Sequence, residues 1–150
     1  MFAIELRPQP EGGEGNVGSA KATGRIEIGG FTETFTVPLG FWGESDYRCS
    51  WRRASEVLDG DPHATSCLVT SMTDPGTSNF LVWWPVYREG EDVFFQNAIV
   101  FLGESAEALD PAAPWVYVTP RRTVDEDGNK VSEWRTSMDS LREFFALDRI

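Results

Sequence analysis

The alternation of apolar and polar residues predicts a β-hairpin near the start of the chain. Residues 24–28 and 31–38 flank Gly29-Gly30, a pair that accepts the positive φ of a two-residue turn. This turn places five apolar side chains on one face: Ile26, Ile28, Phe31, Phe35 and Val37. Glu33 falls on the same face. An inward charge blocks pairing with other chains, which favours a place at the sheet edge over a contact with a partner.

Apolar residues at helical spacing predict two helices. The first spans residues 44–59 and ends before Gly60. The second spans residues 138–147 and begins after Ser137, a good capping residue. Their inward faces carry Tyr47, Trp51, Ala54 and Leu58 in the first helix, and Met138, Leu141 and Phe145 in the second.

The middle of the chain is predicted to be β-structure. Residues 64–72, 79–88 and 91–102 form three strands. The second and third are apolar on both faces, which is typical of central strands covered on both sides. Pro85 lies within the second strand and has no N–H to donate, so we expect it at a bulge or on a locally unpaired side.

Shorter segments complete the pattern. Residues 2–6 form a first strand, and residues 7–20, rich in Gly, Pro and Glu, form a long loop. Residues 103–113 form an acidic loop. Two further strands make a last hairpin, with the run from Asp125 to Asn129 at its tip: residues 115–123 and 130–136.

The order of these elements predicts an α+β protein in one domain, residues 1–150. About eight strands form antiparallel sheets, and two helices are segregated to one side. Two halves share one plan, in which a β-meander is followed by a helix. With 150 residues, of which 13% are aromatic, the chain is long enough to bury a core without disulfides or metals.

Charge narrows the classes of function. Asp and Glu number 24 against 13 Lys and Arg, which gives a formal net charge of −11. A nucleic-acid-binding protein needs a basic surface to displace counterions from phosphates. The acidic balance therefore argues against nucleic acid and favours a basic protein as the partner. The alternative is that acidity only keeps the protein soluble.

The sequence predicts a cytoplasmic protein. Residues 1–6 lack the basic start and apolar run of a signal peptide. The longest apolar run, residues 80–87, is far shorter than a membrane helix. Cys49 and Cys67 do not make a disulfide framework, so we expect reduced thiols and no contact with membranes.

The residue types offer little for catalysis. His63 is the single histidine, and no nucleophile motif accompanies it. No spacing of Cys, His, Asp or Glu matches a metal site, and no glycine-rich loop matches a phosphate site. We therefore expect a binding protein without a cofactor rather than an enzyme. The alternative is small-molecule binding or hydrolysis on the aromatic-lined sheet, using Glu33 or His63.

Short aromatic and acidic motifs follow one another between about residues 37 and 146. They are Pro38–Trp42, Asp46-Tyr47, Ser50-Trp51, Ser71-Met72, Asn79-Phe80, Gln96-Asn97, Val100–Leu102, Arg122-Thr123, Asp125–Gly128 and Ser132–Thr136. Each is unspecific alone, but their order and spacing resemble immunity proteins of contact-dependent growth inhibition systems. Residues 1–25 and 103–120 fall outside this resemblance.

The resemblance implies a function. Such proteins act in the cytoplasm, where they bind the C-terminal toxin domain of a cell-surface effector and protect the producing cell. The branch in question is similar in fold to Whirly single-strand-binding proteins. Its toxin is a nuclease that cuts 16S ribosomal RNA and is blocked by covering of its active-site cleft. A Whirly-like single-strand binder is a third alternative, against which the net charge argues.

Aromatic residues ringed by charge are typical of interface hot spots, and they give three candidate groups for contacts with a basic toxin domain. The groups are Trp42 with Glu44 and Asp46; Glu89 with Glu91 and Asp92; and Asp125 with Glu126 and Asp127. For each group the alternative is a solvated turn. Four further aromatic residues are expected in the core: Trp51, Trp83, Trp84 and Phe95.

Overall fold

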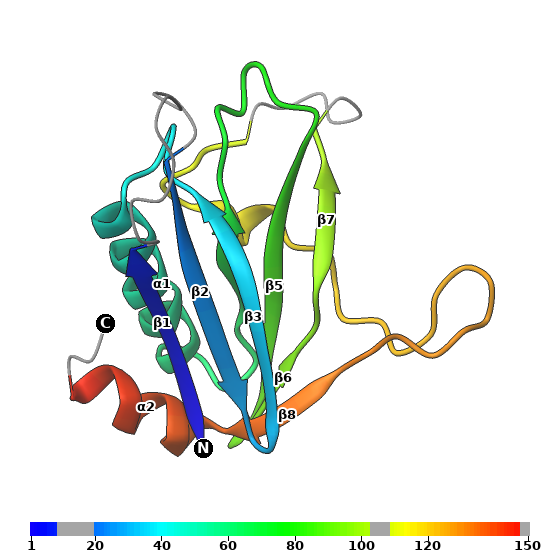
Figure 1. Ribbon diagram of the computed structural model, residues 1–150. Helices are drawn as coiled ribbons and strands as arrows, with labels where there is room; N and C mark the ends of the chain where they lie inside the picture. The colour runs from blue at the N-terminus through cyan, green and yellow to red at the C-terminus, as the bar shows by residue number, and fades with distance from the viewer. Residues whose placement is uncertain (9–19, 103–108, 148–150) are drawn as a thin grey trace.

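The first sheet contains the predicted hairpin. The computed structural model describes residues 1–8, 20–102 and 109–147. Strands β1 (Phe2–Pro8), β2 (Lys21–Ile28) and β3 (Phe31–Pro38) form an antiparallel sheet in that order (Figure 1). Ile28 pairs with Phe31, and Ile26 with Glu33, in the predicted register. β3 lies at the sheet edge, which confirms the edge position of Glu33.

The predicted loop at residues 7–20 is wrong at its start. Arg7 and Pro8 belong to β1 and pair with Thr23 and Ala22 of β2. Ala20, at the other end of the predicted loop, lies outside any strand, as predicted. The remainder of the predicted loop, residues 9–19, lies outside the described residues.

Both predicted helices are confirmed. Helix α1 spans Glu44–Asp59 and is capped by Gly60, and helix α2 spans Met138–Ala146. The Ser137 hydroxyl accepts a hydrogen bond from the Ser140 amide and caps α2 as predicted. The two helices pack against each other on one side of the molecule (Figure 1).

The second sheet differs from the prediction in one strand. Its path runs through β4 (Thr65–Ser71), β5 (Phe80–Glu89), β6 (Asp92–Phe95) and β8 (Trp134–Ser137), and β7 (Ala98–Phe101) also pairs with β5. The predicted strand 91–102 is therefore two strands. They are separated by Gln96-Asn97 and pair with successive stretches of the longer β5.

Pro85 explains where this break falls. The Pro85 carbonyl accepts a hydrogen bond from the Gln96 amide at 3.0 Å, so this side of Pro85 faces the junction between β6 and β7. A residue in a strand directs its N–H and its C=O to the same side, so the missing N–H lies where the ladder is interrupted. The expectation of a locally unpaired side is confirmed.

The expectation that both long strands are covered on both faces holds only for the first. β5 is buried along most of its length. β7 is a half-exposed strand at the sheet edge, because the first sheet does not extend far enough to cover it. Ile99 and Phe101 are exposed there.

The last predicted hairpin is largely wrong. Residues 115–123 form no strand, since Pro114 opens a 3₁₀ turn over Pro114–Tyr117 and Pro120 has no N–H to donate to a ladder. Within the described residues, the hairpin is reduced to one bridge between Val124 and Lys130. β8 begins only at Trp134. The segment between η1 and β8 projects from the body as a loop (Figure 1).

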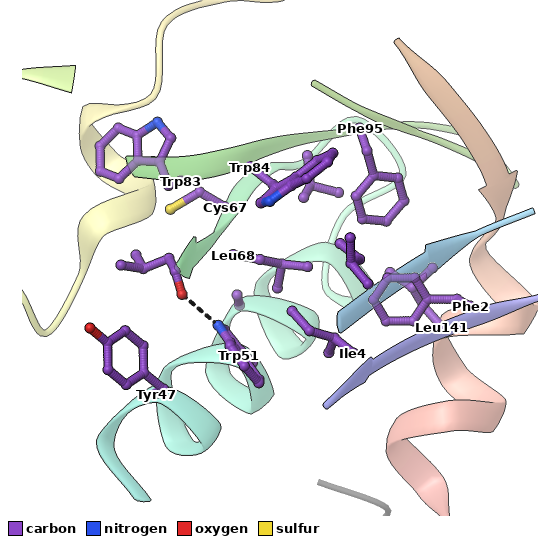
Figure 2. Close-up of a cluster of buried hydrophobic side chains, with 14 of the residues drawn as sticks. Phe2, Ile4, Tyr47, Trp51, Cys67, Leu68, Trp83, Trp84, Phe95 and Leu141 are labelled. Carbon is purple, nitrogen blue, oxygen red and sulfur yellow. Dashed lines mark hydrogen bonds between the residues drawn. The ribbon is translucent and has the colours of Figure 1, made fainter. Parts of the chain in front are cut away.

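One hydrophobic core joins the two sheets and both helices. The four aromatic residues predicted for the core, Trp51, Trp83, Trp84 and Phe95, are all buried. Figure 2 shows the Trp51 indole donating to a β4 carbonyl, that of Val69, at 2.7 Å, and the Phe2 ring stacks on Phe95 across the sheets. The architecture is α+β, and its eight described strands and two helices form two β-meander-plus-helix halves, as predicted. None of the described helices is long and apolar enough to cross a membrane.

Candidate functional site

The first candidate group lies where α1 begins. The Asp46 carboxylate accepts a hydrogen bond from the Gly43 amide at 2.9 Å, so it stabilises the start of its own helix. Glu44 pairs with Arg48 one turn later, at 3.6 Å. The half-buried Trp42 ring packs edge-on against the Tyr47 ring, with centroids 5.1 Å apart. The group is partly exposed, but each member has a structural partner.

The second group lies at the β5–β6 turn and is bound to basic side chains. Glu89 hydrogen-bonds His63 at 3.2 Å, and Asp92 lies 3.7 Å from Arg135. Glu91 contacts Arg88 and Arg142, at 3.5 and 3.3 Å. The arginines offset the charges of Glu91 and Asp92, whereas Glu89 has a histidine as its hydrogen-bond partner.

Arg142 accounts for one carboxylate of this turn, Glu91. Its guanidinium lies 2.9 Å from Asp59, at the end of α1, and 2.9 Å from Asp139 in α2. The hydrogen bonds to Asp59 and Asp139 raise the pKa of the guanidinium. With Glu91 as a further partner, Arg142 links both helices to the turn.

The third group lies on the projecting loop and is the least engaged. Asp125 accepts from the amides of Asp127 and Asn129, at 2.9 Å each, and so shapes the turn. Gly128 has a φ of +82°, the left-handed conformation that closes it. Among the described residues, no arginine, lysine or histidine forms an ion pair with Glu126 or Asp127.

A partly buried network fixes the base of the projecting loop. Glu133 accepts two hydrogen bonds from Arg121, at 2.6 and 2.8 Å, and one from Gln96 at 2.9 Å. The Arg121 guanidinium also lies 3.9 Å from the centre of the Phe94 ring. The hydrogen bonds from Arg121 hold the pKa of Glu133 below its usual range. The loop is therefore anchored to β6 at its base.

The structure does not bring the three candidate groups together. The start of α1, the β5–β6 turn and the projecting loop lie on different sides of the molecule (Figure 1). A partner that covers one of them need not touch the others.

The described residues do not bring together a site for the hydrolytic alternative. His63 is exposed and bonded to Glu89. Larger hollows between β1 and α2, between α1 and α2, beside Trp42 and beside Phe41 are lined by neither His63 nor Glu33. Burial raises the pKa of the Cys67 thiol, which keeps it protonated.

Comparisons with known proteins identify the family. The model of the CdiI N-terminal domain matches residues 37–144. The immunity protein CdiI of Enterobacter cloacae subsp. cloacae is 34% identical over 146 residues, 97% of each chain. The chain belongs to the CdiI family of immunity proteins. A chain of the CdiA-CT/CdiI toxin and immunity complex from Enterobacter cloacae shares the fold with a TM-score of 0.86, at 31% identity and with full coverage of both chains.

The CdiI match confirms the resemblance drawn from the short motifs, and the structure explains several of them. The Tyr47 hydroxyl donates to the Pro38 carbonyl at 2.7 Å and accepts from the Met72 amide at 3.0 Å. Gln96 also donates to the Arg122 carbonyl, at 2.9 Å. These contacts join strands and loops that are distant in sequence, so these residues of the motifs stabilise the fold.

Sequence reasoning missed an exposed apolar surface on this CdiI-family chain. Phe80, Ile99 and Phe101 are 50%, 58% and 66% exposed, and we call them the β7 patch. Their strands are apolar on both faces, a pattern that predicts burial. Only the tertiary arrangement reveals that they are uncovered.

Proposed function

We propose that this chain binds and neutralises the toxin domain of its own contact-dependent growth inhibition system. The proposal rests on the likeness to a chain of the CdiA-CT/CdiI toxin and immunity complex, which extends over the full length of both chains. Immunity is a binding function, and it requires a surface rather than catalytic residues. The protein acts in the cytoplasm, where the toxin would otherwise reach its target.

We further propose that the toxin is a ribonuclease and that this chain covers its basic active site. A domain that cuts RNA needs cationic side chains to hold phosphates. A partner with a net charge of −11 is steered towards such a site and competes with RNA for it. The same charge disfavours the Whirly-like alternative, binding of single-stranded nucleic acid by this chain.

Among the nine candidate residues, Glu126 and Asp127 are the best placed to meet a cation. Asp46 caps α1, and the carboxylates of the β5–β6 turn are paired with arginines or with His63. A carboxylate that already has a cation gains less from a second one, whereas the loop tip loses only water on contact.

The direct test uses the C-terminal domain of the large surface protein that we expect to be encoded immediately upstream. The purified chain should bind this domain at nanomolar concentration and stop its cleavage of ribosomal RNA. The association rate should fall as salt is raised, because long-range steering is screened. An immunity protein from an unrelated system is the control for specificity.

The outcomes separate the parts of the proposal. Failure to bind the neighbouring toxin domain would contradict the immunity function. Binding without any RNA cleavage by the free toxin would retain immunity but contradict the ribonuclease. Binding that leaves RNA cleavage intact would contradict coverage of the active site. The double variant Glu126→Gln/Asp127→Asn tests the loop tip, with Glu44→Gln/Asp46→Asn and Glu89→Gln/Asp92→Asn for the other groups.

A further inference from the structure

The β7 patch is continuous across two paired strands. Phe80 pairs with Phe101, and Val82 with Ile99. Side chains directly opposite each other in an antiparallel ladder share a face, so the patch lies on the same face as Trp84 and Phe95 further along the sheet. Those two residues are buried, whereas the patch is not. The patch thus continues the face of the second sheet that carries Trp84 and Phe95, beyond the part that the first sheet covers.

The cover ends at β3, the edge of the first sheet. The Phe31 ring stacks on Trp134 at 4.3 Å between centroids and lies 6.4 Å from Trp84, so the two sheets are joined there. Glu33 is the next residue of β3 on the same side. It is half-buried and belongs to no ion pair within the described part of the chain. A carboxylate therefore lies on the face of β3 that turns towards the second sheet.

Within the described residues, the backbone of β7 is also unpaired on its outer side. The amides of Gln96 and Leu102 donate to carbonyls of Pro85 and Asn79 in or beside β5. Alternate residues of a strand direct their polar groups to opposite sides, so the N–H and C=O groups of Ile99 and Phe101 point away from β5. No described strand pairs with this edge. Ile99 and Phe101 consequently expose both side chain and backbone.

We propose that β7 is a docking strand on which an extended segment of the toxin domain adds to the second sheet. Main-chain hydrogen bonds to Ile99 and Phe101 would supply affinity, and apolar side chains of the added segment would cover the β7 patch. This inference deepens the proposed function and rests on it. The segment that fits is alternately apolar and carries a Lys or Arg that Glu33 can receive.

Charge selects the toxin over a second copy of this chain. Two copies would each bring a net charge of −11 to a shared sheet, which opposes their association. A basic domain has the opposite sign. The projecting loop with Glu126 and Asp127 extends on the β7 side of the molecule (Figure 1), so a basic partner on β7 approaches further carboxylates.

Two pairs of variants test the two kinds of contact. The N–H that Ile99→Pro removes points outward and bonds no residue of β5, and Thr34→Pro does the same on β3, where Leu39 donates to Ala20 and the alternation turns Thr34 outward. Ile99→Thr/Phe101→Thr removes apolar surface, and Val116→Thr, 71% exposed on η1, is its control. Binding to the neighbouring toxin domain is measured by calorimetry, after circular dichroism has verified folding.

Each β7 change should weaken binding by about tenfold or more, and each control by less than about twofold. Equal binding by the β7 variants and the unaltered chain would overturn the docking strand and leave the proposed function standing. If Ile99→Pro does not fold, the Ile99→Thr/Phe101→Thr variant decides. A dimer that Ile99→Thr/Phe101→Thr dissociates without changing toxin affinity would assign β7 to a second copy and overturn the proposal. No binding by the unaltered chain would overturn both proposals.

Discussion

β3 and β7 each lie at the edge of a sheet, where unpaired backbone groups can pair with another chain, but the two strands differ in the residues that they present there. β3 presents exposed Thr32, Thr34 and Thr36 on its outer face and carries the charge of Glu33 on its inner face. β7 presents Ile99 and Phe101 and carries no charge between Ala98 and Phe101. An exposed apolar edge invites pairing with other chains, and inward charge prevents it.

The difference indicates that the β3 edge is protected against pairing, whereas the β7 edge is available for it. β3 has the composition of an edge that stays in water, and its end is bound to the rest of the fold through the Tyr47 hydroxyl. β7 is held by β5 alone among the described strands. Changes at or beside the two edges distinguish a protected edge from an available one.

The largest effect is expected at the contact that secures β3. In Tyr47→Phe, the Pro38 carbonyl and the buried Met72 amide lose their hydroxyl partner. Leaving buried groups unpaired should lower the free energy of unfolding by about 2 to 3 kcal/mol, measured by urea denaturation. Tyr117→Phe is the matched control, because its hydroxyl accepts from the Asp110 amide at an exposed position.

The stability difference between the unaltered chain and Tyr47→Phe should also depend on pH in alkaline solution. Burial raises the pKa of Tyr47 to about 12, above its usual value of 10.0. A raised pKa in the folded state means that the stability is complete below pH 10 and is lost as the pH rises towards 12. The gap between the unaltered chain and Tyr47→Phe should therefore narrow above pH 10. A gap that is constant up to pH 12 would argue against burial of this hydroxyl.

The next largest effect is expected at Gly24 in β2, which the Phe35 ring of β3 covers. A Cβ on Gly24 would collide with the Phe35 ring, which occupies the space above it. Gly24→Ala should displace this ring and lower the free energy of unfolding by about 1 to 2 kcal/mol. Gly40→Ala, where no heavy atom lies within 4 Å of the added carbon, should change stability little in the same urea titration. Equal effects of the two changes would contradict the close approach.

These contacts also explain which features of the fold could be predicted from the sequence and which could not. Period-two alternation around Gly29-Gly30 predicted the register of β2 and β3, because both signals are local. The break at Gln96-Asn97 was missed because an apolar run does not record a change of partner strand. Exposure of Ile99 and Phe101 depends on where β3 ends in space, and that information is tertiary. For the same reason the sequence could not foresee that Arg88, Arg135 and Arg142 pair with the acidic candidates.

A smaller effect is expected at the junction that separates β7 from β6. Glu133→Gln removes the negative charge of a carboxylate that accepts hydrogen bonds from Arg121 and Gln96. The change should lower the free energy of unfolding by about 1 kcal/mol at neutral pH. The pKa of Glu133 is lowered in the folded state. Its contribution is thus present above the usual carboxyl pKa and is lost as the pH falls through the lowered value.

Unfolding of the unaltered chain and of Glu133→Gln at a series of acidic pH values checks this sign. The two stabilities should converge as the solution becomes more acidic. Divergence in acid would mean that the protonated carboxyl is the better partner for Arg121. Glu126→Gln serves as the control, since its carboxylate has no ion-pair partner among the described residues and its replacement should change the stability little.

The smallest effect on stability, and the sharpest test of the contrast, is expected on β7 itself. Ile99→Lys places a charge where the side chain is 58% exposed, so the free energy of unfolding should change by less than about 0.5 kcal/mol. Its consequence should appear in calorimetric binding to the neighbouring toxin domain: the affinity should fall by about tenfold or more, because a lysine on an edge strand discourages pairing and repels a basic partner. Thr34→Lys adds the same charge to β3 and should change the affinity by less than about twofold, since that edge is already protected. If Thr34→Lys weakens binding as much as Ile99→Lys does, net charge alone governs association and the two edges do not differ.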